Sequence, residues 1–191
     1  IDKVHAMHPD CTFSVETKID GLSMSLRYAK EADGKLHLQL AETRGDGLIG
    51  EDVTANARVI GDVLQVIDLP YDSLELRGEV YMSHEDFEKY NEEQERLEKK
   101  TAANPRNLAA GTLRQLDTSI TKKRGLEMFI FNVQDGPAEI MESHSKGMDI
   151  LKAAGVPVVY HKICKTKDEV VSAIDEIGRM REELPYDIDG A

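Results

Sequence analysis

The chain has 191 residues, of which 40% are hydrophobic and 31% are charged, and its formal net charge is −12. This composition is ordinary for a globular domain with a buried core, and no apolar run approaches the ~18 residues of a membrane span. The acidic balance speaks against a dedicated nucleic-acid clamp, because such proteins gather Lys and Arg to displace counterions from phosphates.

The cysteines and the start of the chain bear on its compartment. Cys11 and Cys164 are isolated in the sequence, which favours a reducing cytoplasm over a disulfide scaffold. The first residues do not resemble a signal peptide. We therefore expect a cytoplasmic protein that has no membrane partner.

The first half of the chain predicts mostly strands. Alternating hydrophobic residues indicate strands over 13–17 and 22–30, and Gly34 allows a turn into a return strand at 35–43. Residues 52–60 predict a short helix, and residues 74–82 predict another strand.

The second half of the chain predicts helices separated by two strands. Ser83 can cap a helix that runs to about residue 100, with Phe87, Tyr90 and Leu97 on its inner face. The further predictions are a helix at 107–116, a strand at 126–133, a helix at 144–154 ended by Gly155, and a strand at 156–163. A capping box of Thr166 and Glu169 then predicts a last helix, with Val170, Ile174, Ile177 and Leu184 on its inner face.

This order of elements predicts the fold class. Strands follow one another in hairpins and runs, with helices between them, so an α+β fold with mostly antiparallel sheets is favoured over a doubly wound parallel sheet. No repeat or linker divides the chain, and residues 1–191 are predicted to form one domain.

The segment V-E-T-K-I-D-G at 15–21 holds the first candidate for chemistry, Lys18. A free lysine has a pKa near ~10.4, so about one amine in 2,500 is neutral at pH 7. Nearby cations and burial away from solvent can lower the lysine pKa and so restore a neutral, nucleophilic amine. The acidic side chains of Glu16 and Asp20 instead favour the charged amine. Read alone, the segment also fits a surface lysine paired with Asp20.

Two other segments are ambiguous in isolation. In T-R-G-D-G at 43–47, Arg44 precedes glycines that let backbone approach a ligand, or the segment is an ordinary turn. In R-G-E-V at 77–80, Glu79 can accept hydrogen bonds from two sugar hydroxyls, or Arg77 forms a cross-strand ion pair. His5, His8 and Cys11 have a metal-like spacing, but ordinary loop residues are the favoured interpretation.

Taken together, the motifs identify a family. The chain carries V-E-T-K-I-D-G, T-R-G-D-G, G-E-D-V-T-A-N at 50–56, R-G-E-V-Y-M at 77–82, N-P-R-N-L-A-A-G-T-L-R-Q-L-D at 104–117 and L-P-Y-D-I-D-G at 184–190. This order closely resembles the adenylation domain of bacterial NAD-dependent DNA ligase over about residues 12–190. The blocks at 50–56 and 104–117 are far more specific than the K-x-D-G pattern at 18–21, because ATP-dependent ligases and RNA capping enzymes also have K-x-D-G.

The resemblance implies the nucleotidyltransferase fold, with two antiparallel sheets and flanking helices around an adenylate pocket. It implies that Lys18 attacks the adenylyl phosphorus of NAD, with Asp20 as a second catalytic residue of the same motif. Other implied roles fall on Glu16, Ile19 and Phe131 at the adenine, Arg44 and Glu79 at the sugar, and Arg106 and Arg114 at nicked DNA and phosphate.

The resemblance also implies partners and absences. NAD supplies the AMP moiety, Mg²⁺ is expected in the whole enzyme, and nicked double-stranded DNA is its substrate. The family's N-terminal subdomain for nicotinamide mononucleotide, and the strand that follows D-I-D-G, have no counterpart here. We therefore expect an incomplete adenylation domain that binds adenosine nucleotides weakly and is inactive or only weakly active with NAD by itself. A nucleotide-binding or interaction module without catalysis is the alternative.

Overall fold

The computed structural model describes residues 1–43 and 50–191. The elements run in chain order as follows: α1 (Asp2–Met7), β1 (Phe13–Glu16), β2 (Lys18–Ile19), β3 (Leu22–Lys30), β4 (Leu36–Thr43), α2 (Thr54–Ala57), β5 (Val66–Ile67), β6 (Ser73–Met82), α3 (His84–Arg96), α4 (Pro105–Leu113), α5 (Thr118–Lys123), β7 (Leu126–Asp135), α6 (Ala138–Met141), α7 (His144–Ala153), β8 (His161–Cys164), α8 (Lys167–Met180) and β9 (Ile188–Gly190).

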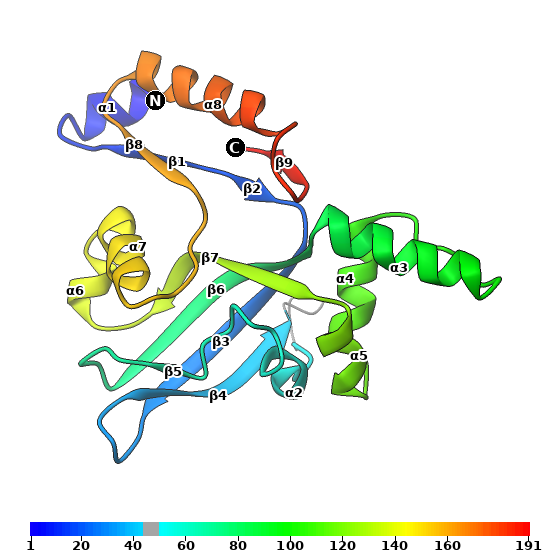
Figure 1. The fold of residues 1–191 in the computed structure, drawn as a ribbon. Helices are drawn as coiled ribbons and strands as arrows, with labels where there is room; N and C mark the ends of the chain where they lie inside the picture. The colour runs from blue at the N-terminus through cyan, green and yellow to red at the C-terminus, as the bar shows by residue number, and fades with distance from the viewer. Residues whose placement is uncertain (44–49) are drawn as a thin grey trace.

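The strands of the described ranges form one large sheet and two small ones. The large sheet has the order β5-β4-β3-β6-β7, and the small sheets pair β1 with β8 and β2 with β9. Each of these strand pairs is antiparallel. In Figure 1 the small sheets lie together with α1 and α8 at one end of the molecule, and the large sheet lies below them. The predicted α+β class with antiparallel sheets is therefore confirmed.

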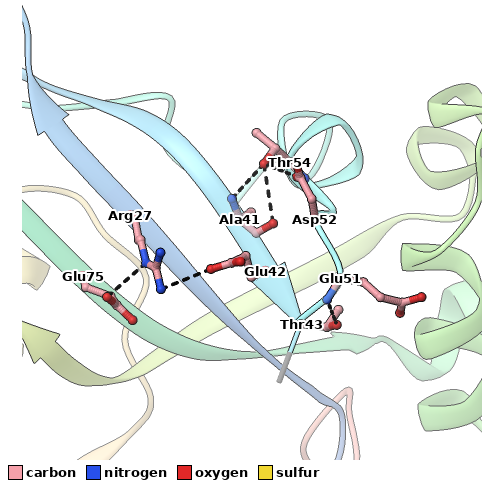
Figure 2. Close-up of polar contacts among 8 residues, drawn as sticks. All are labelled: Arg27, Ala41, Glu42, Thr43, Glu51, Asp52, Thr54 and Glu75. Atoms are coloured by element: carbon pink, nitrogen blue, oxygen red, sulfur yellow. Dashed lines mark hydrogen bonds and ion pairs between the residues drawn. The ribbon is translucent and has the colours of Figure 1, made fainter. Parts of the chain in front are cut away.

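The faces of the large sheet differ because side chains alternate along each strand. On β6, Leu74, Leu76 and Val80 are buried in the main core, which also contains residues of α2 and α4. The opposite face carries charged groups, and Arg27 on β3 pairs with Glu42 on β4 and Glu75 on β6, both at 3.2 Å (Figure 2). One face of the sheet thus packs the main core, and the other carries these ion pairs.

A second, smaller core lies between the small sheets and the end of the large sheet. Val15 and Ile19 from the K-x-D-G segment pack with Ile177 of α8 and Ile188 of β9. Tyr81 from β6 belongs to the same cluster, and its ring stacks on Phe129 of β7 with 5.3 Å between centroids. This cluster holds β1 and β2 against the end of the large sheet.

Several predicted helix boundaries are confirmed in detail. The Ser83 side chain accepts a hydrogen bond from the Asp86 N–H at the start of α3. The capping box of Thr166 and Glu169 opens α8. Gly155 follows α7 with a φ of 84°, a left-handed conformation that glycine adopts without strain.

Two helix predictions and one strand prediction have wrong boundaries. The helix predicted at 52–60 is shorter, since α2 covers only Thr54–Ala57. The helix predicted at 107–116 is α4, which starts earlier, at Pro105. It is followed by α5, which was not predicted. The strand predicted at 156–163 is only β8. Pro157 has no N–H to donate to a ladder, and this segment instead contacts β7, where the Ile130 N–H donates to the Pro157 carbonyl at 2.8 Å.

Two predicted inward-facing residues are exposed. Leu97 is 48% exposed because α3 ends at Arg96 and Leu97 leaves the helix as its C-cap. Ile174 is 47% exposed, and Ala173 is buried in its place on the inner face of α8. The first error came from predicting a helix that runs too far, and the second came from placing the buried face of α8 one residue off.

Candidate active site

A pocket of about 570 Å³ lies beside the second core, which contributes Val15, Ile19 and Val159 to its lining. The continuous segment from Ser14 to Ile19 lines it, together with Glu79 from β6 and Phe131 from β7. Val159, Ile174 and Ala191 complete the lining. The structure therefore brings together five of the predicted site residues from four separate strands: Glu16, Lys18, Ile19, Glu79 and Phe131.

Lys18 reaches this position because the C-terminal motif pairs with its strand. Lys18 lies opposite Gly190 and Ile19 lies opposite Ile188, with an irregular register between the two pairs. The Lys18 Nζ contacts Asp189 Oδ2 at 2.5 Å, and the lysine side chain is 61% exposed. The pairing with Asp20 that the sequence suggested is wrong, because β9 places Asp189 nearer the amine.

Asp20 has a different partner, Arg106. Arg106 Nη1 lies 2.7 Å from Asp20 Oδ1 and 4.0 Å from Asp189 Oδ2. Asn104 caps α4, because its side chain accepts a hydrogen bond from the Asn107 N–H at 2.8 Å, and Pro105 opens the helix. Arg106 therefore sits in the first turn of α4, beside the two aspartates of the K-x-D-G and D-I-D-G motifs.

Gly21 allows the K-x-D-G segment to approach β6. A Cβ atom at this position would overlap the carbonyl oxygen of Val80. Only glycine therefore fits between Asp20 and the strand that carries Glu79. The final residue of the motif thus has a packing reason as well as a place in the family pattern.

Glu79 is the most strongly perturbed carboxyl at the site. Burial raises its pKa from the ordinary value of 4.5 to about 7, although the charges of Arg106 and Lys18 and the Gly21 N–H oppose that rise. No ion pair joins Glu79 to Arg77 in residues 1–43 and 50–191. The surface ion pair considered for R-G-E-V is therefore not formed there, and a half-buried acid lines the pocket instead.

Glu16 and Phe131 lie elsewhere on the pocket wall, and Ile19 is buried with 6% exposure. Glu16 Oε1 accepts hydrogen bonds from Ser14 Oγ and His144 Nε2, both at 2.6 Å. Burial raises the pKa of Glu16, but the bonds from His144 and Ser14 outweigh it and hold the pKa below its ordinary value. Glu16 is therefore ionised at neutral pH.

The other two predicted site residues are the arginines Arg44 and Arg114. Arg44 lies outside the described residues. Arg114 follows α4 as its C-cap, and its Nε contacts Glu51 Oε2 at 2.7 Å. Glu51 also pairs with the end of β4, since the Thr43 N–H donates to its carbonyl at 3.0 Å and its own N–H donates to Thr43 Oγ1 at 3.3 Å (Figure 2).

Asn56 joins the motif at 50–56 to the motif at 104–117, and sequence reasoning missed it. Its side-chain amide donates to the carbonyls of Leu113 at 2.9 Å and Gln115 at 2.7 Å, on either side of Arg114. Its oxygen accepts from Thr121 Oγ1 at 2.8 Å. The last residue of G-E-D-V-T-A-N therefore fixes the backbone that carries Arg114.

His144 and Asp189 are further site residues that the sequence reasoning did not select. Asp189 belongs to the D-I-D-G motif already noted, so the motif itself was a signal. His144 starts α7 in a segment without a recognisable pattern, and only the folded chain places it beside Glu16.

The metal-like spacing of His5, His8 and Cys11 does not correspond to a group of metal ligands in the described ranges. The His5 ring packs edge-on against Phe13 with 5.0 Å between centroids. In the two described ranges, no group of three His, Cys, Asp or Glu side chains is arranged to hold a metal ion. Within the same ranges, none of the helices has the length and apolar character needed to span a bilayer.

Lys18 and Glu79 line the same pocket, and they lie on strands of two different antiparallel sheets. The chain matches the NAD-dependent DNA ligase adenylation domain over residues 1–191, and it belongs to that family.

Individual relatives agree with this assignment. The chain is 45% identical over 184 residues to a DNA ligase of Thermoanaerobacter sp. (strain X514), covering 95% of this chain and 27% of the relative. It is 47% identical over 180 residues to a DNA ligase of Clostridium kluyveri (strain ATCC 8527), covering 94% and 26%. The chain thus spans about a quarter of the length of these curated relatives. A solved chain titled putative ATP-dependent DNA ligase from Aquifex aeolicus has a TM-score of 0.45 and 18% identity, with 95% of this chain and 41% of that chain covered.

Proposed function

We propose that this chain is the adenylation unit of an NAD-dependent DNA ligase and that Lys18 is its nucleophile. The observation that carries the proposal is the position of Lys18 at a pocket of nucleotide size, lined by Glu16, Glu79 and Phe131. Family membership supports it, and the motifs that resemble those of the family supply Glu16, Lys18 and Glu79.

The proposed step is a transfer of AMP from NAD to the lysine. The neutral Nζ attacks the adenylyl phosphorus, an N–P bond forms, and the P–O bond to nicotinamide mononucleotide breaks. The amine loses one proton, and the bonding electrons leave with the nicotinamide mononucleotide phosphate. Arg106, in the first turn of α4, lies where a cation can stabilise charge on the phosphate oxygens.

The ion pair between Lys18 and Asp189 bears on how this step starts. An ammonium group held by a carboxylate has no lone pair with which to attack. Both side chains are exposed, so an incoming phosphate can compete with Asp189 for the amine at little cost. We therefore propose that nucleotide binding separates Lys18 from Asp189 before transfer.

The other predicted residues take roles around the nucleotide. We propose that Glu79 accepts hydrogen bonds from the ribose hydroxyls, and that Glu16, Ile19 and Phe131 contact the adenine. Arg44 is assigned to the sugar by its motif alone. Asp20 acts through Arg106, which it holds at 2.7 Å.

The activity of the whole protein is also proposed. NAD as the AMP donor, and nicked double-stranded DNA as a substrate met by Arg106 and Arg114, follow from the family. The family also leads us to propose that residues 1–191 form one adenylation domain. It leads us to propose a cytoplasmic location as well, which agrees with the two free cysteines. Mg²⁺ is expected because such ions are usually held by one or two carboxylates and substrate phosphates.

The described residues do not form a ready Mg²⁺ site by themselves. Asp20 and Asp189, the aspartates nearest Lys18, are engaged with Arg106 and Lys18, and three convergent ligands are not found in the described ranges. We therefore assign no residue of this chain to Mg²⁺.

A nucleotide-binding module without catalysis is the second candidate. It is favoured by the contact between the Lys18 amine and Asp189, which leaves the lysine charged until a ligand displaces it. A module of this kind binds AMP and never becomes covalently modified.

One experiment separates the two candidates and tests Lys18. A full-length protein that contains this chain is incubated with NAD and Mg²⁺, because the unit alone is expected to be inactive or weakly active, and its intact mass is measured. We expect a gain of one AMP that is lost in Lys18→Ala and in Lys18→Arg, because a guanidinium stays protonated and is a poor nucleophile. Lys89, an exposed lysine paired with Glu85 on α3, supplies the matched control: Lys89→Ala should gain the full mass. AMP transfer to either Lys18 variant would disprove the assignment, and AMP binding without transfer would favour the second candidate.

A further inference from the structure

The Glu16 carboxylate is held by only one of its two oxygens in the described part of the chain. Ser14 Oγ and His144 Nε2 both bond to Oε1, each at 2.6 Å. Ser14 lies two residues earlier on the same strand, whereas His144 comes from the start of α7, 128 residues later in the chain. Neither contact uses Oε2.

The second oxygen belongs to a residue that lines the pocket. Glu16 is a lining residue together with Lys18 and Phe131. Its side chain is 21% exposed, so the carboxylate is not sealed from a ligand. A carboxylate fixed through Oε1 therefore keeps one acceptor available on the wall where the base of a bound nucleotide is proposed to lie.

We propose that His144 is a positioning residue that orients Glu16, so that Oε2 accepts a hydrogen bond from the amino group of adenine and discriminates against 6-oxo purines. This inference rests on the proposed function, which places the adenine at Glu16. It assigns to α7, through one histidine, a part in choosing the base.

The physical basis is the acceptor-only character of an ionised carboxylate. Adenine presents an amino group at its 6-position, which donates a hydrogen bond. Hypoxanthine and guanine present a carbonyl oxygen there, so two acceptors would face each other and both would lose their bonds to water. Sites built to bond a ligand N–H reject analogues without it strongly.

Charge around the pair keeps Glu16 in the required state. The hydrogen bond with Glu16 raises the pKa of His144, and the bonds from His144 and Ser14 hold the pKa of Glu16 low against burial. His161 of β8 lies opposite Glu16 in the register and adds to this effect. Asp149 of α7 contacts His161 Nε2 at 3.7 Å.

The test measures base discrimination at equilibrium, which requires no chemistry at Lys18. AMP and inosine monophosphate are titrated by calorimetry into the wild-type chain, His144→Ala, His144→Gln and His37→Ala. His144 is 38% exposed, so its replacement should not prevent folding. His37 is a matched control, because it also contacts a carboxylate, Asp33 at 2.8 Å, but lies on β4 and does not line the pocket.

We expect the wild-type chain to prefer AMP by roughly tenfold or more, as a site that bonds an N–H should. His144→Ala should lose most of this preference, mainly through weaker AMP binding. His144→Gln should keep most of it, since its amide can donate to Oε1 as the imidazole does. His37→Ala should match the wild type.

The outcomes separate the inference from the function on which it rests. A His144→Ala protein that keeps the wild-type preference overturns the inference, and so does an equal loss for both nucleotides, which would indicate a structural role. Equal wild-type affinity for both nucleotides also overturns it. In each of these cases the mass gain at Lys18 remains a separate result. A wild-type chain that binds neither nucleotide and gains no AMP would remove the proposed function and the inference together.

Discussion

Two polar clusters in this chain are built in opposite ways. At the pocket mouth, Lys18, Asp20, Arg106 and Asp189 form ion pairs whose side chains are 61%, 27%, 53% and 41% exposed. A second cluster, here called the Asn56 cluster, lies between α2, α4 and α5. It contains Asn56, Thr112 and Thr121, which are 6%, 0% and 1% exposed. The first cluster is open to solvent and the second is closed to it.

The difference shows which groups must move and which must not. Exposed ion pairs contribute about 0–1 kcal/mol, so a ligand phosphate can replace them. Buried hydrogen bonds cost much more when one partner is lost, because the other partner cannot turn to water. The residues proposed to meet the ligand are thus held loosely, while the residues that position the motif backbones are held tightly.

The largest effect on stability should come from the Asn56 cluster. Asn56→Ala would leave the Leu113 and Gln115 carbonyls and the Thr121 hydroxyl without this partner. At about 1–3 kcal/mol for an unsatisfied buried group, we expect a loss of about 2–4 kcal/mol in the free energy of unfolding. Urea denaturation measures it.

Asn91 supplies the control for this comparison. Its side chain accepts from the Ala102 N–H at 2.8 Å and donates to the Ala102 carbonyl at 3.3 Å, but it is only half-buried on α3. Asn91→Ala should cost ~0.5–1.5 kcal/mol. Equal losses for the two variants would mean that burial does not distinguish the Asn56 cluster.

The second effect concerns Glu79, whose burial is intermediate between that of the exposed ion pairs and that of the Asn56 cluster. If its carboxylate accepts ribose hydroxyls, Glu79→Gln should weaken AMP and adenosine binding by ~1.5–3 kcal/mol, the range for hydrogen bonds to charged groups. Free adenine has no ribose and should bind almost equally to both proteins. Calorimetry with the three ligands distinguishes loss of a sugar contact from general distortion, which would weaken all three.

Glu79 also predicts a pH dependence of stability. Its carboxyl titrates near pH 7 in the folded chain but at its ordinary 4.5 when the chain unfolds. Between these values the folded state binds more protons, so the contribution of Glu79 to stability falls as pH rises from about 4.5 to about 7. Subtracting the Glu79→Gln stability curve from that of the wild type should reveal this slope, and parallel curves would contradict the raised pKa.

How much of this site could be read from the sequence depends on the distance between its parts. Lys18 and Glu79 were found because each belongs to a recognised motif, and Phe131 was assigned by the resemblance to the family. The partner of Lys18 was misjudged. β2 has two residues and β9 has three, which is too short for a periodic signal, and their pairing joins residues 171 apart.

The supporting groups were harder still to predict. Asn56 was recognised as part of a motif, but its three hydrogen bonds require α4 and α5 to fold against α2. His144 carries no local signal, because its role depends on α7 meeting β1. Local pattern therefore predicted the elements and the motif residues, whereas the contacts that orient those residues are long-range and appear only in the fold.

The smallest effect should come from Asp189, at the exposed end of the comparison. The hydrogen bond from Lys18 lowers the pKa of Asp189 below its ordinary 3.8, so the pair stabilises the fold above that value and is lost as pH falls through the folded-state pKa. Because Lys18 is 61% exposed and Asp189 is 41% exposed, solvent screens the pair. Asp189→Asn at pH 7 should therefore change the free energy of unfolding by only ~0–1 kcal/mol. The change should shrink further at 1 M salt, where the screening length is about 3 Å. Urea denaturation at low and high salt measures both numbers. A loss as large as that of Asn56→Ala would show that the pocket mouth is held as tightly as the buried cluster, and a phosphate could not then displace Asp189 easily.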